Sequence, residues 1–199
     1  NEFYDEAIPV IMNCMNEYQR ALFESPYRAF MEEKIGKVVF KNIEIALKSM
    51  DEKLIPFMQE ENTLTSKYAK LLASAKIPFE GEIYNLSLMT KFTTSSDREV
   101  RRKAYEALSV FFTANQEELD DIYDKLVKNR TQQAKEMGYD NYVELGYYRM
   151  NRNCYDKTMV ENFRNQVKQY MVPYVERLNE ERRKKIQLDK LTFIDNGIF

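Results

Sequence analysis

The residues best suited to binding or chemistry lie close together near the middle of the second half of the chain. They are Tyr147, Tyr148, Arg149, Arg152 and Tyr155. A guanidinium carries a permanent charge and paired N–H donors, and a phenol offers a flat face with a hydroxyl group. Such a combination suits a peptide carbonyl or a C-terminal carboxylate. The alternative is that the two arginines form structural ion pairs while the tyrosines pack at a helix junction.

Other catalytic patterns are excluded by residue type. The sequence contains no histidine, so no Ser or Cys nucleophile can have a histidine base. A di-iron helical bundle requires Glu-x-x-His motifs and is excluded for the same reason. No glycine-rich phosphate loop is present. We therefore predict no catalytic residue and no metal ligand in this chain.

Four pairs of adjacent carboxylates also carry no predicted chemistry. Neighbouring residues on a helix point to different sides. The two carboxylates of such a pair therefore cannot converge as the general acid and the general base of a glycosidase-like site. We interpret all four pairs as surface charges. The pairs are Glu32-Glu33, Glu60-Glu61, Glu117-Glu118 and Asp120-Asp121.

Composition limits the class of protein. The chain has 199 residues, 44% of them hydrophobic, with only 5 Gly and 5 Pro, which is typical of one packed globular unit or a large piece of one. Its net charge of -2 implies neither a nucleic acid nor an anionic membrane as partner. The run Glu180–Lys185 is interpreted as a solvated helix end, in which Glu180 pairs with Lys184 and Glu181 with Lys185.

The cysteines and the ends of the chain suggest a cytoplasmic location and a longer parent. Cys14 and Cys154 lack metal-ligand or redox spacing, which favours reduced, buried thiols. No apolar run approaches the ~20 residues of a membrane helix, and no secretory signal opens the chain. The start at Asn1 without methionine and the apolar segment Thr192–Phe199 lead us to expect a domain of a longer protein.

The first half of the chain is expected to be helical up to a short hairpin. Helices are predicted over residues 5–23, 26–49 and 51–75, with short joints that favour antiparallel packing. Ser25 is the expected cap of the second helix, Pro26 its first residue, and Gly36 its weak point. The segment Ile77–Tyr84 is expected to form a small β-hairpin around Glu80-Gly81.

The second half is predicted to consist of three further helical regions. Ser96 with Glu99 forms a capping box for a run to Met137, which is either one kinked helix or two helices meeting near Ala114. Gly138 is expected to end this run, and Asp140 to cap a short helix through Tyr148.

A last long helix is predicted over residues 156–185, with a bend and no end at Pro173. We expect one buried stripe along it, formed by Met159, Phe163, Val167, Tyr170, Tyr174 and Leu178. The chain is thus divided into a helical region 1–76, a hairpin and loop region 77–95, and a helical region 96–191, all within one domain 1–199.

The segment Gly138–Tyr155 resembles a segment of the oligoendopeptidase F family of zinc metallopeptidases, which are similar to thimet oligopeptidase. There, a long helix ends in Lys-x-x-Gly-Tyr, and a short helix carries Glu-Leu-Gly-Tyr-x-Arg-Met. Further stretches resemble the family's N-terminal helical lobe in the same order. They are the opening Glu2–Glu6, Arg28–Gly36, Gln59–Asn62, Leu71–Ala75, Phe79–Glu82, Asp97–Arg101 and Ile122–Val127.

The resemblance implies an all-α, multi-helix bundle of long antiparallel helices that forms half of a two-lobed oligopeptidase. This lobe would form one wall of a channel for short peptides, with the catalytic lobe of the same chain as its partner. The family's His-Glu-x-x-His helix, which holds the zinc, lies beyond the point that matches Phe199. No zinc ligand is therefore carried over to this sequence. In addition, Asn153-Cys154-Tyr155 replaces the family's usual Asp-Tyr, so any role of that carboxylate is in doubt.

Two functions remain open at this point. The first is the non-catalytic N-terminal part of a zinc oligoendopeptidase. The second is a stand-alone helical module that binds peptides or scaffolds a partner without enzymatic activity. A His-Glu-x-x-His motif encoded downstream of Phe199 would support the first, and a stop codon there would support the second.

We predict that the 199-residue chain binds no zinc in stoichiometric amount and cleaves no peptide. Structural zinc normally takes imidazole, thiolate or several convergent carboxylates, and this chain offers only two distant cysteines. Metal analysis of the purified chain tests the first statement, and a quenched fluorescent peptide tests the second. Stoichiometric zinc or chelator-sensitive cleavage would contradict the prediction.

Overall fold

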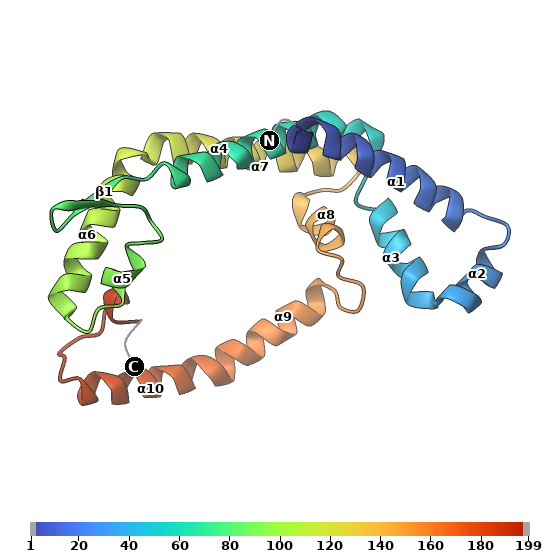
Figure 1. The fold of residues 1–199 in the computed structure, drawn as a ribbon. Coiled ribbons are helices and arrows are strands. Elements are labelled where there is room, and N and C mark those ends of the chain that lie inside the picture. The colour runs from blue at the N-terminus through green and yellow to red at the C-terminus, as the bar shows by residue number, and fades with distance from the viewer. Residues whose placement is uncertain (1–2, 197–199) are drawn as a thin grey trace. The chain divides into compact units, whose positions relative to one another are not determined.

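The computed structural model describes residues 3–196 and confirms an all-α fold with one small β-hairpin (Figure 1). The helices are α1 (Ile8–Phe23), α2 (Arg28–Ile35), α3 (Lys37–Leu47), α4 (Ile55–Ala73), α5 (Thr90–Thr93), α6 (Arg98–Ala114), α7 (Gln116–Glu136), α8 (Tyr142–Arg149), α9 (Lys157–Gln166) and α10 (Val172–Lys185). Strands β1 (Ile77–Phe79) and β2 (Glu82–Tyr84) form the antiparallel hairpin. The predicted apolar end at Gly197, Ile198 and Phe199 lies outside the described residues.

Two compact units make up the chain, and each combines two separate segments. The first contains the chain up to Lys67 together with Asp121–Val160. The second contains Tyr68–Asp120 together with the chain from Glu161 onwards. The tyrosine and arginine cluster belongs to the first unit, and the hairpin to the second.

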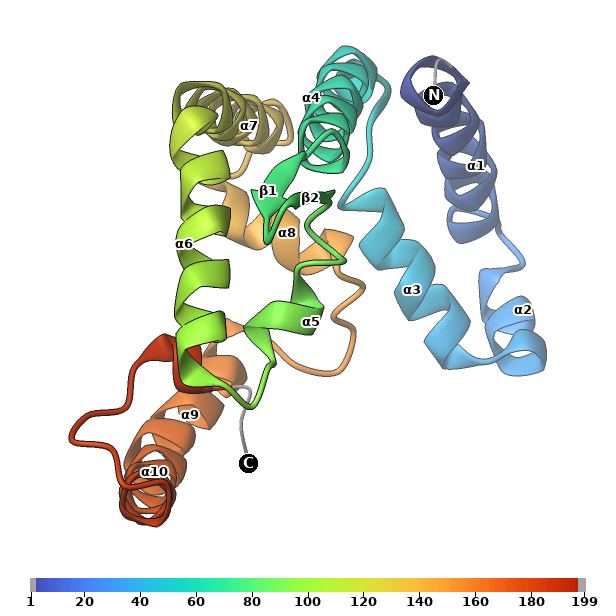
Figure 2. The ribbon, with the colours of Figure 1, turned by 60° about the vertical axis from the view of Figure 1, so that its left-hand side comes forward.

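In the first unit, α1 and α3 pack against each other and run in opposite directions (Figure 2). The buried Asn16 on α1 donates a hydrogen bond to the carbonyl of Met50 at 3.0 Å. Gly36 has a φ of +114°, which a residue with a side chain rarely adopts, so the predicted weak point is a complete break between α2 and α3. At its other end, α2 begins at Arg28, two residues later than predicted, and Ser25 stabilises the preceding turn by accepting from the Tyr27 N–H.

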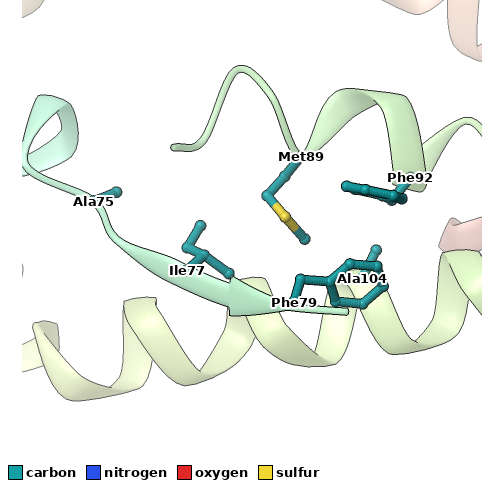
Figure 3. Close-up of a cluster of buried hydrophobic side chains, with 6 residues drawn as sticks. All are labelled: Ala75, Ile77, Phe79, Met89, Phe92 and Ala104. Carbon is teal, nitrogen blue, oxygen red and sulfur yellow. The ribbon is translucent and has the colours of Figure 1, made fainter. Parts of the chain in front are cut away.

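The core of the second unit lies between the hairpin, α5 and α6 (Figure 3). It is formed by Ala75, Ile77, Phe79, Met89, Phe92 and Ala104. The rings of Phe79 and Phe92 lie 4.7 Å apart between centroids. The hairpin forms as predicted: Glu80 and Gly81, with φ values of 49° and 86°, give the turn whose twist matches the strands.

Helix ends in the second half differ from the predictions by single residues. Asp97, and not Ser96, caps α6, because its side chain accepts from the Glu99 N–H at 2.8 Å. Similarly Asn141, and not Asp140, caps α8 by accepting from Val143.

The run to Glu136 consists of two helices, which meet at Asn115. Its end at Gly138 is confirmed by a φ of +82° and by the hydrogen bond from the Tyr139 N–H to the Ala134 carbonyl.

The last helical region passes through Pro173 without ending, as predicted. A π-helical turn, Val167–Met171, directly precedes α10. Proline lacks an N–H and its ring crowds the preceding turn, and a wider turn accommodates both effects.

The prediction of a buried stripe along this region is wrong. Among the described residues nothing covers it: Phe163 is 65% exposed, Tyr170 63% and Met159 54%, and only Val167 is half-buried. The spacing defined an apolar face correctly but did not determine what packs against it. An exposed apolar surface is therefore present on this helix.

A buried carboxylate joins the end of the described chain to α6 in the second unit. Asp195 is fully buried and lies 3.0 Å from both the Arg98 Nε and the Arg101 Nη2, and Arg101 itself is 3% exposed. Thr192 donates to the same carboxylate through its backbone N–H and its hydroxyl. The hydrogen bonds from Arg98, Thr192 and Arg101 outweigh the effect of burial and hold the pKa of Asp195 well below its ordinary value.

We predict that Asp195→Asn destabilises the second unit by about 3 kcal/mol at pH 7, because it leaves the buried Arg101 guanidinium without its counter-charge. The folded pKa lies below the ordinary 3.8, so the stabilisation is present above that pH and is lost as the pH falls toward the folded pKa. Urea unfolding followed by circular dichroism measures the effect. The matched variant Asp120→Asn changes an exposed carboxylate of the same unit and should unfold like the wild type; equal losses in the two variants would contradict the prediction.

Candidate functional site

Helix α8 and the loop after it position the tyrosine and arginine cluster in the first unit. Gly138 ends α7, and Asn141 then caps the start of α8. The buried face of α8 consists of Leu145 and Gly146, so the tyrosines that follow lie at its edge and are half-buried. Asn151 then adopts a left-handed φ of 51°, which redirects the chain after α8.

A pocket of about 440 Å³ lies beside α8. It is lined by Asp140, Asn141, Val143, Glu144, Tyr147, Tyr148, Arg152, Tyr155, Asp156 and Lys157. Four of the five predicted site residues therefore surround one hollow, and Arg149 is the exception. A volume of this size is in the range of small-ligand sites.

Arg152 is held by aromatic rings in the wall of this pocket. Its guanidinium carbon lies 4.1 Å from the centroid of Tyr147 and 5.4 Å from that of Tyr155. Contacts of this kind are favourable and fix the plane of the guanidinium. Within residues 3–196 no carboxylate or carbonyl accepts a hydrogen bond from this side chain. Its N–H donors therefore remain available to a ligand.

Tyr148, which also lines the pocket, lies near the end of α3. Its ring centroid is 5.5 Å from the Lys48 Nζ and 5.9 Å from the Tyr139 ring. Tyr139 donates to the Lys48 carbonyl at 2.8 Å. Burial, followed by the nearby Tyr148 and Glu144, raises the pKa of Tyr139 to about 12, so the Tyr139 phenol is a neutral donor at neutral pH.

Arg149 belongs to a separate buried network that joins α8 to α4 and α7. Its guanidinium lies 3.3 Å from Glu61 and donates to the Gln133 side chain, which is fully buried. Glu61 also accepts from the Arg130 Nε at 2.7 Å and from the Gln133 amide at 2.8 Å. The alternative that the two arginines form structural ion pairs therefore holds for Arg149. Arg152 forms no ion pair among the described residues.

Glu61 is not the surface charge that the sequence suggested. Its side chain is only 15% exposed. Burial alone would raise the pKa of Glu61, but hydrogen bonds from Gln133 and Arg130 and the charge of Arg149 outweigh it and lower this pKa. Asn129 extends the network by donating to Glu60 at 2.6 Å. The polar residues Asn129 and Gln133, four positions apart on one face of α7, are the signal that could have revealed it.

The predicted helix-end charges and the cysteines are also placed by the structure. Glu180 pairs with Lys184 at 3.6 Å, as predicted, and also with Arg183 at 2.7 Å, whereas the predicted pair of Glu181 with Lys185 is not formed among the described residues. Cys14 and Cys154 are free, but both are exposed, so the prediction of buried thiols is wrong.

The described residues do not fit a zinc site. In residues 3–196 no three side chains of His, Cys, Asp or Glu converge to hold a metal ion, and the sequence contains no histidine. The same residues contain no helix that is long and apolar enough to cross a membrane.

Comparison with known proteins gives the family. A model of the peptidase M3 N-terminal domain matches residues 1–50, and a model of peptidase family M3 matches residues 91–196. The chain belongs to peptidase family M3. The resemblance to oligoendopeptidase F is thereby confirmed. No curated protein matches the sequence.

Three solved structures of peptidases are similar along the whole chain. A structure assigned as oligoendopeptidase F from Bacillus anthracis str. Ames is 42% identical, with a TM-score of 0.94 over 99% of this chain. A second structure assigned as oligoendopeptidase F is 43% identical, with a TM-score of 0.95 over 100%. PZ peptidase A, solved with an inhibitor, is 43% identical, with a TM-score of 0.95 over 99%. The chain spans only 36%, 35% and 35% of these three structures.

We predict that Glu61→Gln destabilises the first unit by about 2 kcal/mol at pH 7, because it removes the charge that Arg130 and Arg149 share. The folded pKa of Glu61 lies below its ordinary 4.5, so the stabilisation is complete above that pH and disappears as the pH falls toward the folded pKa. Chemical unfolding at pH 7 and at pH 3 measures it. The exposed Glu33 of the same unit provides the control Glu33→Gln. The prediction fails if both variants unfold at the same denaturant concentration.

Proposed function

We propose that this chain is the N-terminal, non-catalytic part of a cytoplasmic zinc-dependent oligoendopeptidase that hydrolyses short peptides. The main support is its membership of family M3 together with the whole-chain similarity to oligoendopeptidase F structures. Because the chain has no histidine, the zinc and the water it activates would be held by residues outside this sequence. The domain 1–199 would then contribute one wall of the peptide channel and pack against the catalytic lobe of the same protein.

The pocket beside α8 is the proposed peptide-binding part of this wall. Arg152 would hold a peptide carbonyl or the C-terminal carboxylate, because its N–H donors are open and its plane is fixed by Tyr147 and Tyr155. Tyr148 would add a hydroxyl donor and a ring face. These four residues would bind substrate without taking part in bond cleavage.

Arg149 is proposed to act as a positioning residue. Its guanidinium is engaged by Glu61 and Gln133 and does not line the pocket. It would hold α8 against α4 and α7, and so keep the tyrosines of α8 at the pocket wall. We expect its loss to change stability first and peptide binding only through movement of α8.

A stand-alone peptide-binding or scaffolding module remains the second candidate. One observation favours it: all residues that line the pocket belong to the first unit, so the pocket requires no residue from a catalytic lobe. Peptide binding by the 199-residue chain, without a longer peptidase that contains the sequence, would support this alternative.

We predict that Arg152→Gln in the intact peptidase raises KM about tenfold and leaves kcat within about twofold. Loss of a group that binds ground state and transition state equally has this signature, and a charged hydrogen bond of this kind is worth about 1.5 kcal/mol. The increase should shrink for peptides with an amidated C-terminus if the carboxylate is the group bound. Arg20→Gln removes an exposed arginine of α1 that lies outside the pocket and should change neither constant. An unchanged KM for Arg152→Gln would rule out the proposed binding role.

A further inference from the structure

The wall of the α8 pocket carries more negative than positive charge. Three carboxylates line it, from Asp140, Glu144 and Asp156, against the cations Arg152 and Lys157. No salt bridge connects any of these three carboxylates to a lysine or arginine within the described range 3–196. Lys48, which is not among the residues that line the pocket, acts on Glu144 electrostatically without forming a salt bridge with it.

Several other acidic residues at the surface of the described chain are paired with a lysine or an arginine. Glu44 lies 2.8 Å from the Lys48 Nζ, Asp121 lies 2.7 Å from the Lys125 Nζ, and Glu180 lies 2.7 Å from the Arg183 Nε. Each of these pairs follows the spacing of a helix turn. The pocket carboxylates lack such partners, although lysines and arginines are frequent in the sequence.

The interactions that these carboxylates do make leave acceptor positions open. Asp156 accepts from the Met159 N–H at 2.9 Å through Oδ1, which leaves Oδ2 for a ligand. Glu144 contacts the Tyr148 hydroxyl at 3.5 Å, the long limit of a hydrogen bond. Asp140 is exposed beside them.

The pocket's own arginine is not placed to neutralise them. The Arg152 guanidinium lies against the faces of Tyr147 and Tyr155, at 4.1 and 5.4 Å, and makes no hydrogen bond with Asp140, Glu144 or Asp156. The pocket therefore offers both a guanidinium with open donors and carboxylates with open acceptors. A ligand that satisfies both carries an acceptor for Arg152 and a cation for the acidic side chains.

We propose that this pocket selects peptides that present a positively charged group, an ammonium or guanidinium, to Asp140, Glu144 and Asp156. The inference rests on the proposed peptide-binding function and adds the charge of the preferred substrate. The cation could be a Lys or Arg side chain or the free N-terminus, which share the same chemistry. An apolar or acidic residue at the same position would leave the carboxylates without a partner.

The test uses the intact peptidase and one short peptide in three forms, with lysine, norleucine or glutamate at a single position, each with a free or an acetylated N-terminus. Norleucine keeps most of the apolar chain of lysine and removes its charge. We compare kcat/KM for the wild type and for the double variant Asp140→Asn, Glu144→Gln. Asp156 is left unchanged because it caps α9. Glu33→Gln is the control, since it removes an exposed carboxylate of the same unit outside the pocket.

The wild type is expected to prefer lysine over norleucine about three- to tenfold at low salt, as two exposed charge pairs would give. The double variant should lose most of this preference, and the control should retain it. If only N-terminal acetylation reduces kcat/KM, the bound cation is the N-terminal ammonium, which also supports the proposal. Circular dichroism checks that the variants are folded.

Two outcomes overturn the inference. One is equal kcat/KM for the lysine and norleucine peptides in the wild type with no effect of acetylation, and the other is a preference that survives in the double variant. Neither result affects the broader peptidase proposal, provided that the peptides are cleaved and Arg152→Gln raises KM. If none of the peptides is cleaved, the proposed peptidase function is wrong. The charge preference is then tested separately, by titrating the three peptides into the protein and comparing their affinities.

Discussion

The first unit depends on how one buried carboxylate is neutralised. Glu61 on α4 receives hydrogen bonds from Arg130 and Gln133 on α7 and the charge of Arg149 on α8. A buried charge without partners would cost several kcal/mol, so the three helices must keep the positions in which the donors reach Glu61. This constraint sets the position of α8, and with it the position of the tyrosines that line the pocket. The site is thus supported by a polar network and only in part by apolar packing.

Two arginines of the same loop region illustrate how position decides role. Arg149 is in the last turn of α8 and reaches the network at Glu61, while Arg152 follows the left-handed Asn151 and stacks on Tyr147 and Tyr155. Their residue type is the same, so the difference in role comes from their surroundings. The left-handed conformation of Asn151 changes the direction of the chain between the two residues. Arg149 before it is a structural cation, and Arg152 after it keeps its hydrogen-bond donors open.

The features that the sequence predicted are those that depend on local conformation. Gly36 and Gly138 end helices because of backbone angles that only glycine adopts readily, and Glu80-Gly81 turns the hairpin for a similar reason. Caps were displaced by one residue, from Ser96 to Asp97 and from Asp140 to Asn141, since neighbouring residues offer similar acceptors. The burial of Glu61 could not be predicted, because its partners are about 70 to 90 positions away in the sequence. Likewise, the spacing of Phe163 and Tyr170 defined an apolar face without showing whether anything covers it.

The π-helical turn Val167–Met171 changes the rotation of everything that follows it. An α-helix advances by about 100° per residue, and a π-turn accommodates one residue more than an α-turn over the same rise. The side chains of α10 are therefore rotated by roughly that angle from where an uninterrupted α-helix would place them. Losing a single residue from this turn would restore the α-helical count and leave Tyr174 and Leu178 in their present orientation, because the wider turn already absorbs that residue. Converting the turn to an α-helix with all its residues kept would instead rotate Tyr174 and Leu178 by roughly 100° relative to Phe163. The width of this turn, more than the apolar character of any one of its residues, decides whether α9 and α10 present one continuous face.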